Sequence, residues 1–205
     1  MNNIVFMVSY KKNINGKKQW NEITKYTKEN FKDKGFKVNM VEGYFKKDYP
    51  DIKTNELVYL NFIDKAIPKV EKYLNKNKSI NGVFIAEDDA WINLTYTELK
   101  NKLKLNKNEP LIRIGYQKKL KLNKPDTFYV VGRQLIWIPR NSIEHIKEVM
   151  SHSQPQHLNG FFSKNKKLKV VLAEKGLVDE CEHLSLTSKK LRRGRDCTKK
   201  TKKTI

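Results

Sequence analysis

Three consecutive carboxylates, Glu87, Asp88 and Asp89, are the residues of this chain best suited to do chemistry. Two like charges about 4 Å apart cost about 1 kcal/mol in water and several times more in a half-buried site, so a cation should accompany the acids. Carboxylate oxygens suit Mg²⁺ or Mn²⁺, which favours a divalent metal shared with a phosphorylated substrate. The alternative is a solvated turn whose acids cap a helix that begins near Thr95.

An apolar run led by Gly82 ends at these acids. Its residues, Val, Phe, Ile and Ala at positions 83–86, are too few for a helix and favour a buried strand. In open α/β sheets, ligands bind at the carboxyl ends of the strands. The sequence therefore predicts that the acids lie at the ligand-binding edge of a sheet.

The other apolar patterns predict an α/β fold that positions this edge. Helical spacing starts at Trp20 and stops at Gly35, and a second helical pattern is kinked or broken at Pro68. We expect a single nucleotide-binding domain with a central mixed, mostly parallel sheet flanked by helices. The predicted strands cover 4–9, 36–41, 82–86, 111–116, 128–131, 132–138 and 168–173, and the predicted helices cover 20–34, 55–74, 94–105 and 142–150.

The segment Ile85–Ala90 resembles the "(L/I)-x-E-D-D-A" segment of the glycosyltransferases of lipopolysaccharide biosynthesis, glycosyltransferase family 25, which have the GT-A fold. In that fold the acids after a central strand form the "DxD" motif, which holds a metal on the diphosphate of a sugar nucleotide. The resemblance implies that Glu87 and Asp89 bind the metal. It also implies that Glu87 and Asp88 contact the donor, with Asp88 in a catalytic position.

Two later segments add to the resemblance, which covers roughly residues 80–186. Residues 132–142 are similar to the family's strand-to-helix unit "G-x-x-(A/G)-Y-x-(I/L)-S-R-x-(G/A)-A", although Pro139 departs from it and Trp137 stands near the usual Tyr. Arg133 in this unit is a candidate acceptor or phosphate contact. Residues 176–185 loosely resemble the closing "P-x-L-V-x-Q…S" segment, without its Pro. GT-A enzymes often return a C-terminal His or acid to the metal, which implies His183.

A candidate general base lies where the family usually shows "P-x-D". This chain has His157 two residues after Pro155 instead. An inverting glycosyltransferase needs one base for the acceptor hydroxyl, and His titrates near neutral pH. We expect His157 in that role and Asn159 as a positioning group. A structural His on a loop is the alternative, and a retaining enzyme would need no base.

Two further loops carry candidate contacts to the substrates. Ser9 ends the first predicted strand, and Tyr10 and Lys11 follow it. All three are candidate donor contacts: Tyr10 could stack on the donor base and Lys11 could meet phosphate. The basic loop 117–125 includes Lys118 and Lys119, which could form a phosphate-contacting rim. Ordinary solvated loops are the alternative for both.

Composition sets bounds on the partners. The 205 residues include 43 Lys and Arg against 22 Asp and Glu, a net charge of +21, while a hydrophobic content of 38% is that of a globular chain. A polyanionic partner or a biased source composition would account for the charge. We expect a domain over 1–186 and a basic, flexible tail over 187–205.

The cysteines and the hydropathy favour an intracellular, soluble protein. Cys181 and Cys197 are too few and too loosely placed for a disulfide framework or a zinc cage, which favours a reducing interior. No apolar run approaches about 18 residues, and no basic segment precedes a long apolar stretch at the N-terminus. The sequence therefore predicts neither a membrane span nor a signal peptide.

The resemblance implies metal-dependent transfer of a sugar from a nucleotide-diphosphate donor, with UDP-glucose as first choice, to a hydroxyl. The net charge favours a nucleic-acid acceptor. Glycosyltransferases that modify hydroxymethylated DNA bases are known in viruses and some parasites, so we expect a hydroxymethylated base to be the acceptor. A glycan or protein acceptor remains open. From other classes, a metal-dependent nuclease would need further acids near the motif, and Glu42, Asp64 and Asp179 are separated in sequence. If the chain were a non-catalytic nucleic-acid-binding protein, the three acids would have no function.

Overall fold

A computed structural model describes residues 3–9, 17–44, 48–103, 105, 112–116, 135–151, 170–175, 177–181, 183–184, 191–192 and 197. Within these residues, six strands form the central sheet in the order β2-β1-β3-β6-β5-β7, and β6 is the one that runs against the other five. The strands are β1 (Ile4–Ser9), β2 (Lys37–Glu42), β3 (Gly82–Glu87), β5 (Ile112–Tyr116), β6 (Leu135–Pro139) and β7 (Val170–Lys175).

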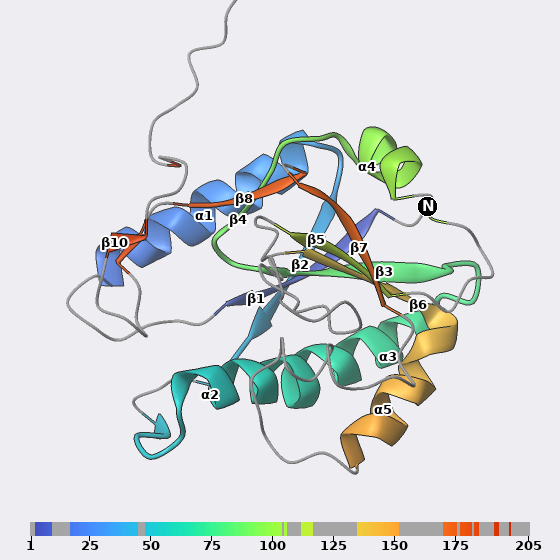
Figure 1. Cartoon of the computed structure of the whole chain (residues 1–205), viewed down its shortest axis with the longest axis horizontal. Helices are drawn as coiled ribbons and strands as arrows, with labels where there is room; N and C mark the ends of the chain where they lie inside the picture. The colour runs from blue at the N-terminus through green and yellow to red at the C-terminus, as the bar shows by residue number, and fades with distance from the viewer. Residues whose placement is uncertain are drawn as a thin grey trace, which may run out of the picture.

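Helices cover both faces of this sheet (Figure 1). Helices α1 (Lys17–Asp33) and α4 (Tyr96–Lys102) lie on one face. The other face is covered by α2 (Thr54–Leu60), η2 (Asn61–Ala66), α3 (Ile67–Lys76) and α5 (Ile143–Ser151). Alternate residues of β1 enter the two apolar cores, so the strand is buried on both sides. The predicted α/β class, with a mixed, mostly parallel sheet flanked by helices, is confirmed.

Two glycines have the roles that their positions suggest. Gly35 has a φ of 87°, in the left-handed region that favours glycine, and it ends α1 as predicted. Gly82 opens β3 directly opposite β6. A Cβ at Gly82 would lie 2.5 Å from the ring of Trp137 and 2.6 Å from the carbonyl oxygen of Ile138, so a larger residue would push the two strands apart.

The long helical pattern before β3 changes at Asn61, about two turns before Pro68, where the break was predicted. Helix α2 ends at Leu60, the π-helical turn η2 follows, and Pro68 lies in the first turn of α3. Proline lacks an N–H, and its ring clashes with the carbonyl four residues back. The chain accommodates Pro68 by widening the turn in front of it, and the first turn of α3 then tolerates the proline.

The described residues contain short elements that the sequence patterns did not predict. Strand β4 (Ala90–Ile92) pairs antiparallel with β8 (Val178–Glu180), and β9 (His183–Leu184) pairs with β10 (Leu191–Arg192). A 3-10 turn, η3 (Arg140–Ser142), leads from β6 into α5. The predicted strand at 128–131 lies outside the described residues. No described helix is both long and apolar enough to cross a membrane.

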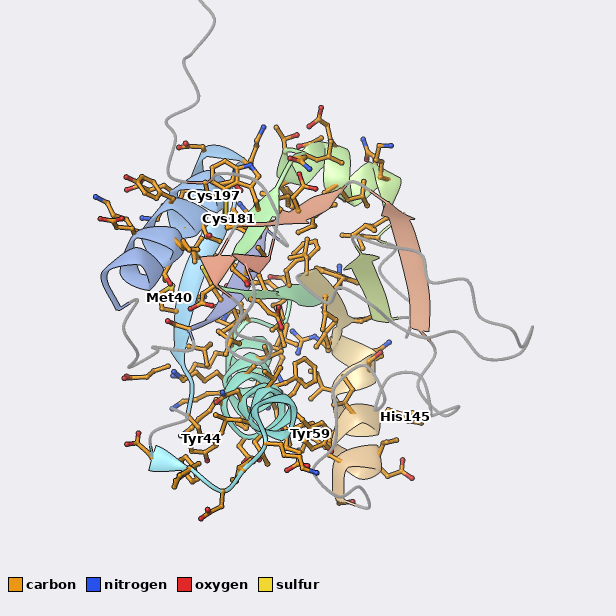
Figure 2. The ribbon with its side chains drawn as sticks, turned by 60° about the vertical axis from the view of Figure 1, so that its left-hand side comes forward. Met40, Tyr44, Tyr59, His145, Cys181 and Cys197 are labelled. Atoms are coloured by element: carbon orange, nitrogen blue, oxygen red, sulfur yellow. A yellow bond between two sulfur atoms is a disulfide. The ribbon has the colours of Figure 1, made fainter. Side chains whose placement is uncertain are left out.

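The two cysteines are joined, which corrects the prediction from their spacing. Cys181 and Cys197 form a disulfide with a Cα–Cα distance of 5.5 Å, beside α1 (Figure 2). Both are buried and pack against Ile23 of α1 and Trp91 of β4. Residue 197, which we assigned to a flexible tail, is therefore attached to the domain.

Candidate active site at the carboxyl edge of the sheet

The carboxyl ends of three parallel strands bring polar residues together at one edge. Ser9 ends β1 opposite Glu42 of β2, and the preceding residue, Val8, lies opposite Glu87 of β3. Neighbouring strands lie about 4.8 Å apart, so these ends are adjacent. Ser9 is buried, Glu87 is half-buried and Glu42 is exposed. The acid motif thus follows β3 at the sheet edge where ligands bind in α/β folds, as predicted.

The turn formed by Asp88 and Asp89 is held from two sides. Both residues are buried, with 0% and 6% of their surface exposed. The hydroxyl of Thr24 on α1 donates a hydrogen bond of 3.2 Å to Oδ2 of Asp88. The backbone N–H of Cys181 donates to the carbonyl oxygen of Asp89 at 2.9 Å. The position of the turn therefore depends on both α1 and the C-terminal segment.

A row of small polar residues on α1 contacts the acid turn, β4 and Cys181. Thr24, Thr27 and Asn30 are three residues apart, so they lie on one side of the helix. Oδ1 of Asn30 accepts from the N–H of Ile92 at 2.8 Å, and its Nδ2 donates to the carbonyl of Ile92 at 3.2 Å. The hydroxyl of Thr27 lies 3.7 Å from the Sγ of Cys181. We did not predict this polar row, although its spacing is visible in the sequence.

The C-terminal segment returns to the acid motif through β8. This strand runs antiparallel to β4, with Asp179 opposite Trp91. Nδ2 of Asn93 donates to Oδ2 of Asp179 at 2.9 Å. His183 is two residues beyond Cys181, so its Cα lies within about 7 Å of the Cα of Cys181. The backbone of His183 is thus close to the acid turn, while its side chain is outside the described part of the structure.

Several predicted contact residues lie outside the described residues, and their roles stay predictions. Strand β5 ends and β6 begins at this same edge, because Leu135 at the start of β6 lies opposite both Ala86 of β3 and Gly115 of β5. Strand β7, by contrast, begins at the other edge, where Val170 lies opposite Ile112. The residues are Tyr10 and Lys11, which follow β1, Lys118 and Lys119, which follow β5, Arg133, which precedes β6, and His157 and Asn159.

The donor atoms of the edge fit a metal that is shared with a phosphorylated ligand. Among the described side chains, no group of three or more His, Cys, Asp or Glu is placed to hold a metal ion. Mg²⁺ in proteins is usually held by one or two carboxylates, with substrate phosphates and water completing its shell. Glu87 and Asp89 could supply those carboxylates. The additional converging acids that a nuclease would need are not found in the described part of the chain.

A hollow of about 530 Å³ lies between α3 and α5, on the face of the sheet that α1 does not cover. Burial raises the pKa of Asp64 in its wall, and Lys147 and Glu71 form an ion pair of 2.7 Å there. Its lining residues are Ile63, Asp64, Ile67, Pro68, Glu71, Lys147, Met150 and Ser151. None of the predicted site residues lines this hollow.

No protein-family model matches the chain, and no curated protein matches it. Among solved structures, the chain is similar to a glycosyltransferase involved in the glycosylation of the major capsid of PBCV-1, with a TM-score of 0.49 and 10% identity, over 82% of this chain and 80% of that one. It is also similar to CTP:phosphocholine cytidylyltransferase from Streptococcus pneumoniae, with a TM-score of 0.37 and 14% identity, over 88% and 73%. Likenesses this distant identify no reaction for the present chain.

Proposed function

We propose that this chain is a metal-dependent glycosyltransferase that moves a sugar from a nucleotide-diphosphate donor to a hydroxyl group. The observation that carries the proposal is the acid turn at the carboxyl edge of the sheet, beside the end of β1, with the C-terminal segment returned to it by the hydrogen bond between Cys181 and Asp89. This edge is the nucleotide-binding edge of α/β sheets. The resemblance of Ile85–Ala90 to glycosyltransferase family 25 supports the same chemistry.

Each candidate residue has its own role in the proposed transfer. Glu87 and Asp89 would hold Mn²⁺ or Mg²⁺, which when bound stabilises the negative charge of the departing diphosphate as a Lewis acid. Asp88 faces Thr24 and fixes the turn from inside. In the inverting form of the reaction, His157 takes the proton of the acceptor hydroxyl, whose oxygen attacks the anomeric carbon as the bond to the diphosphate breaks. His183 is the further candidate ligand for the metal.

The acceptor we favour is a hydroxymethylated base in DNA, and the donor a UDP-sugar such as UDP-glucose. A net charge of +21 supports a polyanionic acceptor. A base within a duplex would have to be extruded before its hydroxyl could reach the donor. A glycan or protein acceptor is the alternative within the same chemistry.

Thermal melting with sugar nucleotides tests the proposal. UDP-glucose, UDP-galactose, UDP-N-acetylglucosamine and GDP-mannose are each added with and without Mn²⁺ to the wild type and to Asp89→Asn. A donor at a hundred times its dissociation constant adds about 2.7 kcal/mol of stability. We expect one donor to protect the wild type only with metal, and Asp89→Asn to lose that protection. Asp33→Asn, which removes an exposed carboxylate at the end of α1, should keep it.

Transfer itself is then measured by mass spectrometry of DNA that contains hydroxymethylated cytosine, with unmodified DNA and a glycan as comparison acceptors. A gain of one hexose on the hydroxymethylated DNA alone is the expected product. If no sugar nucleotide protects the wild type while DNA stabilises both the wild type and Asp89→Asn, the chain is a nucleic-acid-binding protein and the proposed transfer is wrong.

A further inference from the structure

A pair of tyrosines extends the sheet edge beyond the end of β2. Among the described residues, Tyr49 is one of two large hydrophobic side chains that are exposed, at 38%. The ring of Tyr44 packs against it with centroids 5.0 Å apart and the planes at 65°. Nζ of Lys65 lies 4.1 Å from the centroid of the Tyr44 ring. The exposed ring of Tyr49 is thus supported by an aromatic neighbour that also carries a cation.

The backbone at Tyr44 is held by the side chain of Asn61. Asn61 is completely buried in the π-helical turn η2, and its side chain bonds both the N–H and the carbonyl of Tyr44. A Cβ at Gly43 would lie 2.8 Å from Oδ1 of Asn61, so a glycine is needed for this approach. The N–H of Gly43 donates to the carbonyl of Ser9 at 3.1 Å. Tyr44 is therefore held next to the edge that carries the acids, and Tyr49 packs against its ring. Figure 2 shows Tyr44 beside the α2 and α3 layer.

A row of lysines leads away from the tyrosines along η2 and α3. Lys65, Lys69, Lys72 and Lys76 are separated by four, three and four residues, so they share one side of the helix. The opposite side, with Ile67, Val70 and Leu74, is buried against the sheet. Lys69, Lys72 and Lys76 are exposed, and the row spans about 16 Å at 1.5 Å per residue.

Of the acids near these elements, Asp64 precedes Lys65 and interacts with it electrostatically, so Lys69, Lys72 and Lys76 are the exposed part of the row. Glu71, on the same helix, bonds Lys147 of α5 at 2.7 Å, so its charge is already balanced. Asp48 and Asp51 flank Tyr49 and are exposed. Negative charge at that end repels phosphate, while carboxylate oxygens can accept hydrogen bonds from the N–H groups of a base. The surface therefore has one end suited to a base and one suited to phosphates.

We propose that Tyr49 and the lysine row bind an unpaired stretch of nucleic acid, with one base stacked on Tyr49 and the phosphates along Lys65, Lys69, Lys72 and Lys76. Proteins that bind single strands combine stacking aromatic rings with a positively charged track in this way. A row of lysines alone would be an ordinary solvated helix face, and the exposed, braced tyrosine distinguishes this one. That the bound strand is the acceptor rests on the proposed function, whereas the binding itself does not.

Fluorescence anisotropy with a labelled single-stranded thymidylate oligonucleotide tests the site without donor or metal. Tyr49→Leu should weaken binding about 5- to 100-fold, while Tyr49→Phe, which keeps the ring, should bind like the wild type. Replacing Lys69 and Lys72 together by Gln should lower the slope of log K against log salt by about 1.4, or 0.7 per phosphate contact. The matched control replaces Lys32 and Lys100 by Gln, since both are exposed on the opposite helical layer, and should leave the slope unchanged.

A strand of abasic sites of equal length, tested on the wild-type protein, separates stacking from charge. It should bind as weakly as thymidylate binds Tyr49→Leu. The site is overturned if the abasic strand binds the wild type as tightly as thymidylate, or if the control lysine pair matters as much as the Lys69 and Lys72 pair. It is also overturned if Tyr49→Leu keeps strand binding but loses sugar-nucleotide protection, because the ring would then serve the donor base. Failure of the transferase proposal would appear separately, as absent donor protection with strand binding intact.

Discussion

Arg140 acts on the start of β3 through the backbone. Its Nε and Nη2 donate to the carbonyl of Ile80 at 3.0 and 2.8 Å, and Nη2 also donates to the carbonyl of Asn77 at 2.7 Å. These carbonyls belong to the turn between α3 and β3. The planar guanidinium supplies several donors in fixed directions, which suits this arrangement. Arg140 belongs to the segment that resembles glycosyltransferase family 25, and here it fixes the strand that presents the acids.

Replacing Arg140 by Met should lower the free energy of unfolding by about 2 to 3 kcal/mol, because two backbone carbonyls lose a charged hydrogen-bond donor. Urea unfolding measures the loss. Lys147→Met is the matched control, since it removes a cation whose ion pair with Glu71 is partly exposed, and it should cost no more than about 1 kcal/mol. Equal losses in the two variants would contradict a special role for Arg140.

Thr24 should matter for donor binding as a positioning residue, because its hydroxyl donates to the buried Asp88. Thr24→Val keeps the shape and removes the donor, and we expect it to weaken Mn²⁺-dependent sugar-nucleotide binding about tenfold, from the roughly 1.4 kcal/mol that one such hydrogen bond contributes. Thr24→Ser should restore binding. Titration calorimetry measures the affinity of each variant. A loss of thermal stability without a change in affinity would show that the hydroxyl only supports the fold.

The position of the acids could be predicted from the sequence, whereas their partners could not. Glu87, Asp88 and Asp89 directly follow an apolar run, so local pattern alone places them at a strand end. Thr24 and Asp88 are 64 residues apart, and their hydrogen bond exists because α1 packs against β4. Such a contact depends on tertiary packing, which the local pattern does not contain.

The elements beside the acid turn were missed for a physical reason as well. Strands β4 and β8 have three residues each, too few to show an alternating pattern, and they form because the C-terminal segment comes back to pair there. The disulfide was missed because it requires Cα atoms about 5.5 Å apart and not a particular spacing in sequence. The longer apolar elements, such as β1 and α3, were predicted because each carries its own periodicity.

The disulfide between Cys181 and Cys197 should hold β8 against β4. A closed loop of about 15 residues contributes about 3 kcal/mol in the chain-entropy account, so Cys197→Ser should lower the free energy of unfolding by about 2 to 4 kcal/mol. Urea unfolding with and without reductant measures this. Reductant should bring the wild type to the level of Cys197→Ser and leave the variant unchanged. A wild type that is indifferent to reductant would mean that the bond does not stabilise the fold.

The capping box of α4 makes a pH-dependent contribution to the stability of the protein. The backbone N–H and the hydroxyl of Thr95 each donate to Oε2 of Glu98 at 2.8 Å, and these bonds lower the pKa of Glu98 below its ordinary 4.5. A lowered pKa means that the contribution is complete above pH 4.5 and is lost as the pH falls through the folded value. Urea midpoints of the wild type and Glu98→Gln should therefore differ at pH 7 and converge at acid pH. A constant difference would contradict the assignment.

At the scale of the whole molecule, composition predicts a partner class but not where the charge acts. The excess of 43 basic over 22 acidic residues is spread along the chain. The fold places Lys65 of η2 and three lysines of α3, Lys69, Lys72 and Lys76, in one row on the helical surface. The overall order of strands and helices was predictable because each long element is locally patterned. The order of the strands in the sheet was not, because it follows from how the elements pack together.

Two truncations separate the charge of the C-terminal region from its attachment. Deleting residues 198–205 removes four lysines and keeps Cys197, so the free energy of unfolding should stay within about 0.5 kcal/mol. The salt slope for single-stranded DNA should fall by at most about 3, or 0.7 for each lysine that meets a phosphate. Deleting residues 187–205 also removes the disulfide partner of Cys181, and stability should fall by about 3 kcal/mol. If the shorter deletion destabilises the protein as much as the longer one, residues after Cys197 support the fold, and the attachment at Cys197 is not what secures the C-terminal region.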